Sequence, residues 1–106
     1  MKQYGFVYIT AQNRQEAQKV ARVCLDKKLA ACANIFPSIL SCYEWKDQYT
    51  EEEEAILILK TRQDLFEELR KTVISCHSYT CPCIVFIPIS KAHLPFLSWM
   101  DSQLKK

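Results

Sequence analysis

The amino-acid sequence predicts an α+β domain in which helices pack on a sheet as a split βαβ sandwich. Two observations lead to this prediction. Segments of strand and helix pattern follow one another as strand, helix, strand, strand, helix, strand, and a short helix comes last. The length of 106 residues suffices for one hydrophobic core but not for two. We therefore expect a single domain over residues 1–106 with the ferredoxin-like βαββαβ order plus a C-terminal helix.

The first strand and the first helix are predicted from residue patterns. Residues 5–10 (GFVYIT) are rich in aromatic and β-branched side chains and are bounded by polar residues, as in a strand. A helical pattern starts at Asn13, because apolar residues then recur on one face at three- and four-residue spacing. Those residues are Ala17, Val20, Ala21 and Cys24. The sequence therefore predicts that this face packs on the sheet.

A long hairpin is predicted next. Residues 29–36 are small and apolar, which fits either the end of a helix or a strand. Pro37 cannot donate to a strand ladder, so it indicates a bulge or bend. Residues 39–45 have strand composition, residues 46–48 form a polar turn, and residues 49–59 are typical of the returning strand.

The second half repeats the strand–helix pattern. Thr61 is predicted to be an N-cap, with Asp64 completing a variant capping box, for a helix that includes residues 65–74. Residues 83–89 form an apolar run typical of the last strand. Residues 94–100 begin a short helix, with a proline in its first turn.

The composition excludes several functional classes. The formal net charge is +2 and the basic residues form no large cluster, which gives no argument for nucleic-acid binding. The single glycine excludes a P-loop and a dinucleotide-binding fingerprint, since both need several glycines. We find no signal-peptide pattern and only strand-length apolar runs, so we expect no membrane partner and a cytoplasmic protein. The six cysteines are then expected to be thiols.

Four potential metal ligands lie close together before the last strand: Cys76, His77, Cys81 and Cys83. Thiolate and imidazole groups select soft or borderline ions such as Cu(I), Cu(II) or Zn(II). Residues 81 and 83 would point to the same side of an extended segment. The spacing fits no standard structural zinc site. The alternative is that Cys83 is a buried small apolar residue, that the other thiols lie on the surface, and that His77 is a hydrogen-bonded residue at a helix end.

The hairpin offers aromatic and acidic residues. Tyr43 and Trp45 share one face of their strand, and they form either core, a ligand wall or a subunit interface. Most of the run Glu51–Glu54 is expected to be a solvated edge. Glu54 borders an apolar run, so we expect it to be partly buried and to need a partner, either Lys60 or another subunit. No acid is placed to orient His77 beside the nearby hydroxyls, so we expect no enzyme.

The ordered motifs resemble those of the CutA divalent-ion tolerance proteins. The first block is matched by residues 28–35 (KLAACANI) and 41–45 (SCYEW), and the second by Glu54 with Lys60-Thr61. The third is matched by His77-Ser78-Tyr79 with Pro82, then Pro88-Ile89 and Leu97-Ser98-Trp99. The resemblance is collinear over nearly the whole chain. It implies a homotrimer in which the hairpin strands pair across subunits and close the sheet edges.

The resemblance also implies a function. The CutA family is linked to tolerance of copper and other divalent cations, with copper binding attributed to some members and no catalytic activity. The PII signalling trimers have a similar architecture. The alternative function is therefore a PII-like module that binds a small anion or a protein partner in its inter-subunit clefts, in which case Lys60 would hold the anion.

Four positions depart from the family pattern. Asp47 replaces a turn glycine, Cys83 replaces an acid after the proline, Ile9 replaces a cysteine found in some members, and Cys76 replaces a histidine found in some members. We predict a copper or divalent-cation site of His77, Cys76 and Cys83 at the mouth of an inter-subunit cleft. The predicted cleft residues are Tyr43, Trp45, Glu54, Lys60 and Tyr79.

Overall fold

The computed structural model describes residues 2–106 and shows a four-stranded antiparallel sheet with the strand order β2–β3–β1–β4. The strands are β1 (Tyr4–Ala11), β2 (Cys32–Trp45), β3 (Gln48–Arg62) and β4 (Ile84–Pro88). The helices are α1 (Arg14–Asp26), α2 (Phe66–Cys76) and α3 (Leu94–Gln103), and a 3₁₀ turn, η1 (Gln63–Leu65), precedes α2. The predicted ferredoxin-like α+β fold is confirmed. No helix of the described residues is long and apolar enough to cross a membrane.

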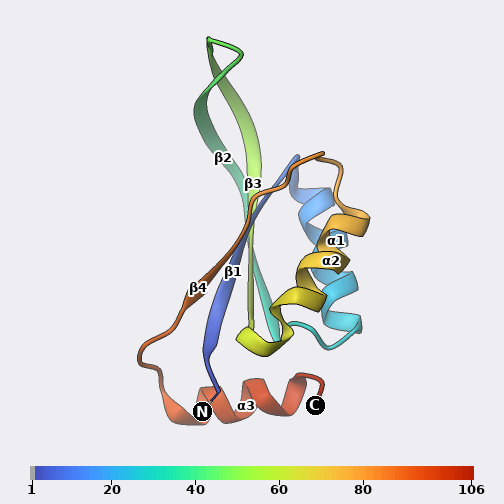
Figure 1. The fold of residues 1–106 in the computed structure, drawn as a ribbon, viewed down its shortest axis with the longest axis vertical. Coiled ribbons are helices and arrows are strands. Elements are labelled where there is room, and N and C mark those ends of the chain that lie inside the picture. The colour runs from blue at the N-terminus through green and yellow to red at the C-terminus, as the bar shows by residue number, and fades with distance from the viewer. Residues whose placement is uncertain (1) are drawn as a thin grey trace.

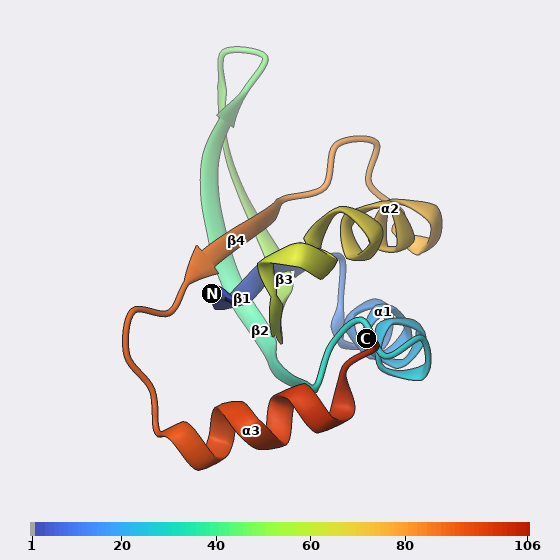
Figure 2. The ribbon, with the colours of Figure 1, turned by 60° about the horizontal axis from the view of Figure 1, so that its bottom comes forward.

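Helices α1 and α2 pack side by side on one face of the sheet (Figures 1 and 2). Alternate residues of β1 are buried toward them, among them Val7 and Ile9. The apolar face predicted for α1 is buried as expected. Asn13 caps this helix, because its side-chain oxygen accepts a hydrogen bond of 2.9 Å from the backbone N–H of Glu16. The core therefore lies between the sheet and this helix pair.

The hairpin of β2 and β3 projects beyond the helices at the top of Figure 1. The sequence left residues 29–36 as either the end of a helix or a strand. In the structure residues 29–31 precede β2, and the strand begins at Cys32. A register shift between Phe36 and Ile39 confirms the bulge predicted at Pro37. Lys46 and Asp47 form the turn with φ values of 52° and 65°, so both adopt the left-handed conformation.

The other face of the sheet is apolar and partly open. Tyr8 of β1 pairs with Ile58 of β3 and with Val85 of β4 across this face. Val85 is 48% exposed, and Phe36 of β2 is 53% exposed. Helix α3 lies across the lower end of the sheet (Figure 2), where the Lys60 ammonium group sits 5.4 Å from the Phe96 ring centroid. The described part of the chain leaves the upper part of this face without cover.

The predicted N-cap at Thr61 is wrong. Strand β3 continues to Arg62 because Arg62 pairs with Tyr4 of β1. Thr61 is fully buried in this strand, and its hydroxyl donates a 2.6 Å hydrogen bond to the carbonyl of Leu29. Asp64 does not complete a capping box either, since its carboxylate accepts from the Arg62 guanidinium at 2.9 and 3.2 Å. Sheet pairing thus overrides the local capping pattern.

Arg62 ties the lower ends of the sheet and of α3 together. Its side chain is 5% exposed, and its guanidinium also donates to Asp101 at 3.0 Å and to the carbonyl of Lys105 at 2.9 Å. Tyr4 donates its hydroxyl to the second carboxylate oxygen of Asp101 at 2.7 Å. This network fixes the C-terminal helix against β1 and β3.

Gly5 is required where β1 passes β4. A Cβ atom at this position would overlap the Phe86 ring and would lie 2.6 Å from the carbonyl oxygen of Ile87. The backbone carbonyl cannot move aside as a flexible side chain could, so the close approach of these strands depends on the glycine.

Candidate functional site

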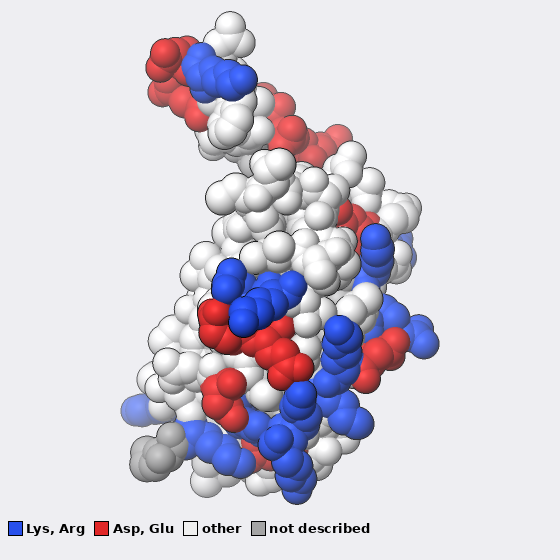
Figure 3. Space-filling model, turned by 45° about the vertical axis from the view of Figure 1, so that its right-hand side comes forward, with Lys and Arg blue, Asp and Glu red and all other residues white. Residues whose placement is uncertain are grey.

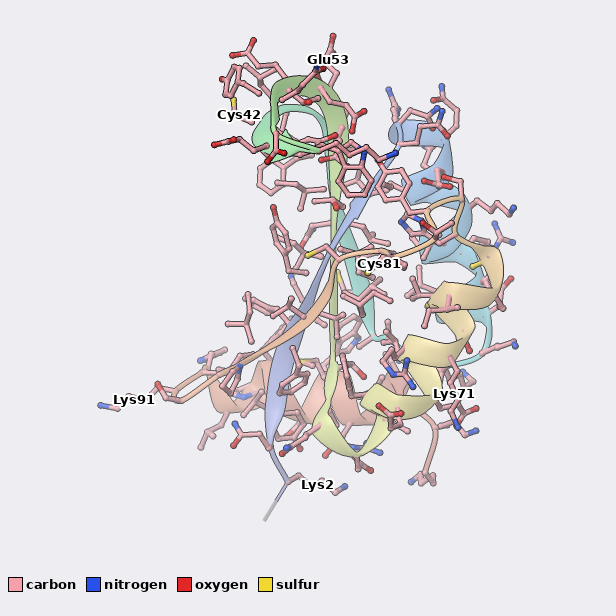
Figure 4. All side chains as sticks on the ribbon, turned by 45° about the horizontal axis from the view of Figure 1, so that its top comes forward. Lys2, Cys42, Glu53, Lys71, Cys81 and Lys91 are labelled. Atoms are coloured by element: carbon pink, nitrogen blue, oxygen red, sulfur yellow. The ribbon has the colours of Figure 1, made fainter. Side chains whose placement is uncertain are left out.

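A pocket of about 570 Å³ lies between the projecting part of the hairpin, the end of β1 and the segment joining α2 to β4. Its lining residues are Thr10, Tyr43, Trp45, Thr50, Glu52, Glu54, Tyr79, Thr80, Cys81 and Cys83. Figure 4 shows Cys81 on the segment between α2 and β4, where this segment runs past the strands. The pocket is therefore built from parts of the chain that are distant in sequence.

The structure brings five of the eight predicted site residues together in this pocket: Tyr43, Trp45, Glu54, Tyr79 and Cys83. The prediction missed three threonines, Glu52 and Cys81 as lining residues. Glu52 carried a usable signal, because residues two apart in a strand point to the same face and Glu54 was already predicted. The three threonines carried no such signal, because threonine is common on either face of a strand.

His77 lies behind the pocket and does not line it. Its side chain is fully buried, with Nε2 2.8 Å from the carbonyl oxygen of Thr10 and Nδ1 accepting a 3.0 Å hydrogen bond from the backbone N–H of Tyr79. An amide N–H can only donate, so Nδ1 carries the lone pair and Nε2–H donates to Thr10. Both ring nitrogens are thus used, and neither is available to a metal ion in this arrangement.

Glu16 holds the same segment from the side of α1. Its carboxylate accepts 2.8 Å hydrogen bonds from the backbone N–H groups of Gln12 and Ser78. Burial opposes the charged form, but these hydrogen bonds outweigh burial and lower the pKa of Glu16. Glu16 and His77 together anchor the start of the segment that carries Cys81 and Cys83.

Cys76 and Lys60 lie apart from the pocket. The Cys76 thiol donates to the carbonyl of Thr72 at 3.3 Å and packs against the core, and burial is the main cause that raises its pKa. Lys60 lies over Phe96 at the opposite end of β3. It is therefore no partner for Glu54 within one chain, and the expected pairing of these two residues is not found.

Two tyrosines donate to the two pocket carboxylates. Tyr79 reaches Glu54 Oε2 at 2.6 Å, and Tyr43 reaches Glu52 Oε1 at 3.1 Å. Burial, and next the bond to Glu54, raises the pKa of Tyr79 well above its ordinary value. Burial and then the bond to Glu52 raise the pKa of Tyr43. Both phenols consequently remain protonated donors at neutral pH.

The pocket carries negative charge only. Its ionisable lining residues are the two glutamates, the two tyrosines and the two cysteines, with no lysine or arginine among them. Glu54 is only 8% exposed, and no ion pair within residues 2–106 includes it. On the face shown in Figure 3, acidic side chains predominate on the hairpin and basic side chains gather lower down. This arrangement favours a cationic ligand.

The residues of one chain do not form a complete divalent-metal centre. Within residues 2–106, no three His, Cys, Asp or Glu side chains are grouped to hold one metal ion. His77 is saturated with hydrogen bonds, and Cys76 faces the core. The pocket thus offers two thiols and two carboxylates but no imidazole. The expected set of His77, Cys76 and Cys83 is not brought together.

Comparison with known proteins agrees with the sequence motifs. The profile of the family described as "CutA1 divalent ion tolerance protein" matches residues 5–103. The "Divalent-cation tolerance protein CutA" of Archaeoglobus fulgidus is 44% identical over 102 residues, which cover 96% of this chain and 99% of that protein. "Protein CutA" of Homo sapiens is 34% identical over 93 residues, and the match covers 88% of this chain but only 52% of the human protein.

Solved structures show the same fold. The structure described as the periplasmic divalent cation tolerance protein CutA from Archaeoglobus fulgidus has a TM-score of 0.93 at 43% identity and covers 96% of this chain and 99% of that chain. CutA1 from Oryza sativa has a TM-score of 0.95 at 33% identity, and the match covers 98% of this chain and 95% of that chain. The description of the first as periplasmic differs from the cytoplasmic location that we expected, and that location stays a prediction.

Proposed function

The chain belongs to the CutA1 divalent ion tolerance protein family, and from this premise we propose that it is a homotrimeric tolerance protein that binds metal cations, copper first among them. The sequence predicted a metal site of His77, Cys76 and Cys83. We keep Cys83 and place the cation in the pocket that it shares with Glu54. We propose no catalytic activity, no nucleic-acid partner and a cytoplasmic location.

The observation that supports this proposal most directly is the environment of Glu54. A carboxylate that is 8% exposed loses most of its hydration, so it needs a compensating charge or several hydrogen bonds. Tyr79 supplies one hydrogen bond, and no Lys, Arg or His of residues 2–106 supplies a positive charge. The carboxylate also faces a pocket whose charged residues are all acidic. A bound cation would compensate it.

The homotrimer is supported by two surfaces of the single chain. The uncovered sheet face exposes Val85 and Ile87, each by nearly half, and Phe36 by more. Among residues 2–106, the long edge strand β2 pairs only with β3 and leaves its other edge free. Further copies of this chain would cover the apolar face and pair with the free edge, as the family resemblance implies.

The geometry favours a cation over the anionic ligand of the alternative, PII-like function. Such a ligand would need a positive group in the pocket, and Lys60 was the predicted one. Lys60 instead lies over Phe96 at the other end of β3, and Glu52 and Glu54 line the pocket. A small anion would therefore meet two carboxylates without a compensating cation in the single chain.

The test measures uptake of Zn(II) and of Cu(I), separately, by reduced and anaerobic protein of known oligomeric state, in competition with a calibrated chelator. We expect saturable binding that Glu54→Gln weakens about 10- to 100-fold for at least one ion. The matched control is Glu53→Gln, which should leave binding unchanged. Glu53 points to the other face of the strand, where its carboxylate accepts a hydrogen bond from Ser38. If neither ion binds to saturation, the proposed function is wrong.

A further inference from the structure

Two of the six thiols lie in the pocket, and the other four do not line it. Cys24 is fully buried, and its pKa is raised to about 12 by burial. Cys32 belongs to β2, and Cys76 packs on the core. Cys42 is exposed on the hairpin, apart from Cys81 in Figure 4. Only the sequence Cys81-Pro82-Cys83 places two free thiols at the same pocket.

The segment that carries this pair is held at its start. Glu16 accepts from the Ser78 N–H, His77 accepts from the Tyr79 N–H, and Tyr79 donates to Glu54. Pro82 further restricts the backbone between the two cysteines, because its ring fixes φ. These contacts lower the conformational entropy that a ligand would have to remove from the segment on binding. Both thiols therefore lie on one restrained segment and line the same pocket.

The donor types select the ion. Thiolates are soft ligands that favour Cu(I), whereas structural Zn(II) sites use four ligands, usually cysteines and histidines. The pocket has no imidazole, and within residues 2–106 no third ligand is grouped with the pair. Glu54 and Glu52 supply negative charge that attracts a cation, but they are hard oxygen donors. The site thus suits a soft monovalent cation better than a divalent one.

We propose that Cys81 and Cys83 bind one Cu(I) ion per subunit as a two-sulfur site, with Glu54 and Glu52 as nearby charges rather than ligands. The inference rests on the proposed cation-binding function and names its ion and its ligands. Each thiol releases one proton and forms one S–Cu bond, and no electron is transferred, because copper arrives as Cu(I). Proton release then makes the affinity increase with pH, by up to about 100-fold per unit for two protons.

The test is a Cu(I) competition titration on reduced, anaerobic protein with the variants Cys81→Ser, Cys83→Ser and their combination. We expect one tight Cu(I) per subunit in the wild type and a loss of at least about 100-fold in the double variant. Cys42→Ser is the matched control, because this exposed thiol does not line the pocket, and it should bind as the wild type does. X-ray absorption at the copper edge should show sulfur neighbours without imidazole.

Three outcomes would overturn the two-thiol site while leaving the proposed function intact: unchanged Cu(I) affinity in the double variant, an imidazole in the copper shell, or binding of Zn(II) as tightly as Cu(I) through the same thiols. Saturable binding that depends on Glu54 but not on the thiols would support cation binding in the pocket and overturn the two-thiol site. Absence of saturable binding of either ion would overturn both. The variants must keep the wild-type far-ultraviolet circular dichroism spectrum and oligomeric state.

Discussion

Tyr79 donates its hydroxyl to Glu54 across 2.6 Å, and this bond joins the segment after α2 to the base of the β2–β3 hairpin. The backbone N–H of the same tyrosine donates to His77, whose ring lies 4.7 Å away from the Tyr79 ring between centroids. Tyr79 therefore connects the buried imidazole to the pocket carboxylate. A substitution at any of these three residues should therefore alter the position of the pocket side chains.

Replacement of Tyr79 by Phe keeps the ring and removes the donor to Glu54. We expect the free energy of unfolding to fall by about 1–3 kcal/mol, because a largely buried carboxylate loses its hydrogen bond. Denaturant unfolding of the protein measures this loss. Tyr43→Phe is the control, since Tyr43 makes the equivalent bond to Glu52 in an exposed position and should cost less than about 0.5 kcal/mol. Equal losses would show that burial of Glu54 is not decisive.

His77 should carry a proton on Nε2 and a lone pair on Nδ1, as its two hydrogen bonds require. Nitrogen-15 chemical shifts of the imidazole ring at neutral pH measure the tautomer directly. His77→Ala should lower the free energy of unfolding by about 2–4 kcal/mol, because it removes two hydrogen bonds and leaves the Thr10 carbonyl and the Tyr79 N–H without partners. His93→Ala, at an exposed position, is the control. A proton on Nδ1 would contradict this assignment.

Stability at acid pH should depend on Asp101. The hydrogen bond from Tyr4 lowers the pKa of Asp101 in spite of burial, and Arg62 adds to this effect. A lowered pKa in the folded state contributes stability above the ordinary carboxyl pKa of about 4, and the contribution is lost as the pH falls through the folded value. We expect Asp101→Asn to be less stable than the wild type at pH 7 and to lose less stability between pH 5 and pH 2.

Chemical denaturation across this pH range provides the measurement. Asp47→Asn is the control, because Asp47 lies in the exposed hairpin turn and asparagine tolerates its left-handed conformation. The control should follow the wild-type profile. Identical acid profiles of Asp101→Asn and the wild type would show that the Arg62 network makes no contribution to acid sensitivity.

The hairpin turn should be improvable by one substitution. Asp47 has a φ of 65°, a conformation that glycine adopts without steric cost. We expect Asp47→Gly to raise the free energy of unfolding by about 0.5–1 kcal/mol, with thermal unfolding as the measurement. Asp26→Gly is the opposing control, since Asp26 ends helix α1 with ordinary helical geometry and glycine should destabilise it.

Oligomerisation should depend on the open sheet face. Val85→Lys places a charge on that face and should convert the proposed trimer to smaller species, as measured by light scattering after size-exclusion chromatography. Ile74→Lys is the matched control, because Ile74 is almost equally exposed but lies on helix α2. Wild-type mass for both variants would argue that the uncovered sheet face is not the interface.

The sequence predicted the order of elements because the signals are local. Asn13 caps α1 and Pro37 marks the bulge, as expected. The polar turn predicted at residues 46–48 joins β2 to β3 but is one residue shorter, since Gln48 already belongs to β3. The prediction for Thr61 was wrong because a good capping residue also fits a strand, and only the pairing of Arg62 with Tyr4 decides between them. Pairing partners 58 residues apart give no local signal.

The site was predictable in part. Tyr43, Trp45 and Glu54 were expected in a cleft, and the structure places them in one pocket. The alternative for His77, a hydrogen-bonded residue at a helix end, is confirmed, because His77 is the C-cap of α2 and both ring nitrogens are bonded. Its partner Thr10 lies 67 residues earlier in the chain, so the sequence could not name that partner. Lys60 was expected near Glu54, yet strand geometry separates residues six apart by about 20 Å.

The chain has one glycine, and it stands where two strands meet at a distance that admits no Cβ atom. All glycine codons share their first two bases, so every single-base change that alters the amino acid at position 5 introduces a Cβ. The smallest of these, alanine, already meets the Ile87 carbonyl. Every non-synonymous change at this codon therefore forces β1 and β4 to move apart, so a saturation library selected for stable protein should be strongly enriched in glycine at position 5.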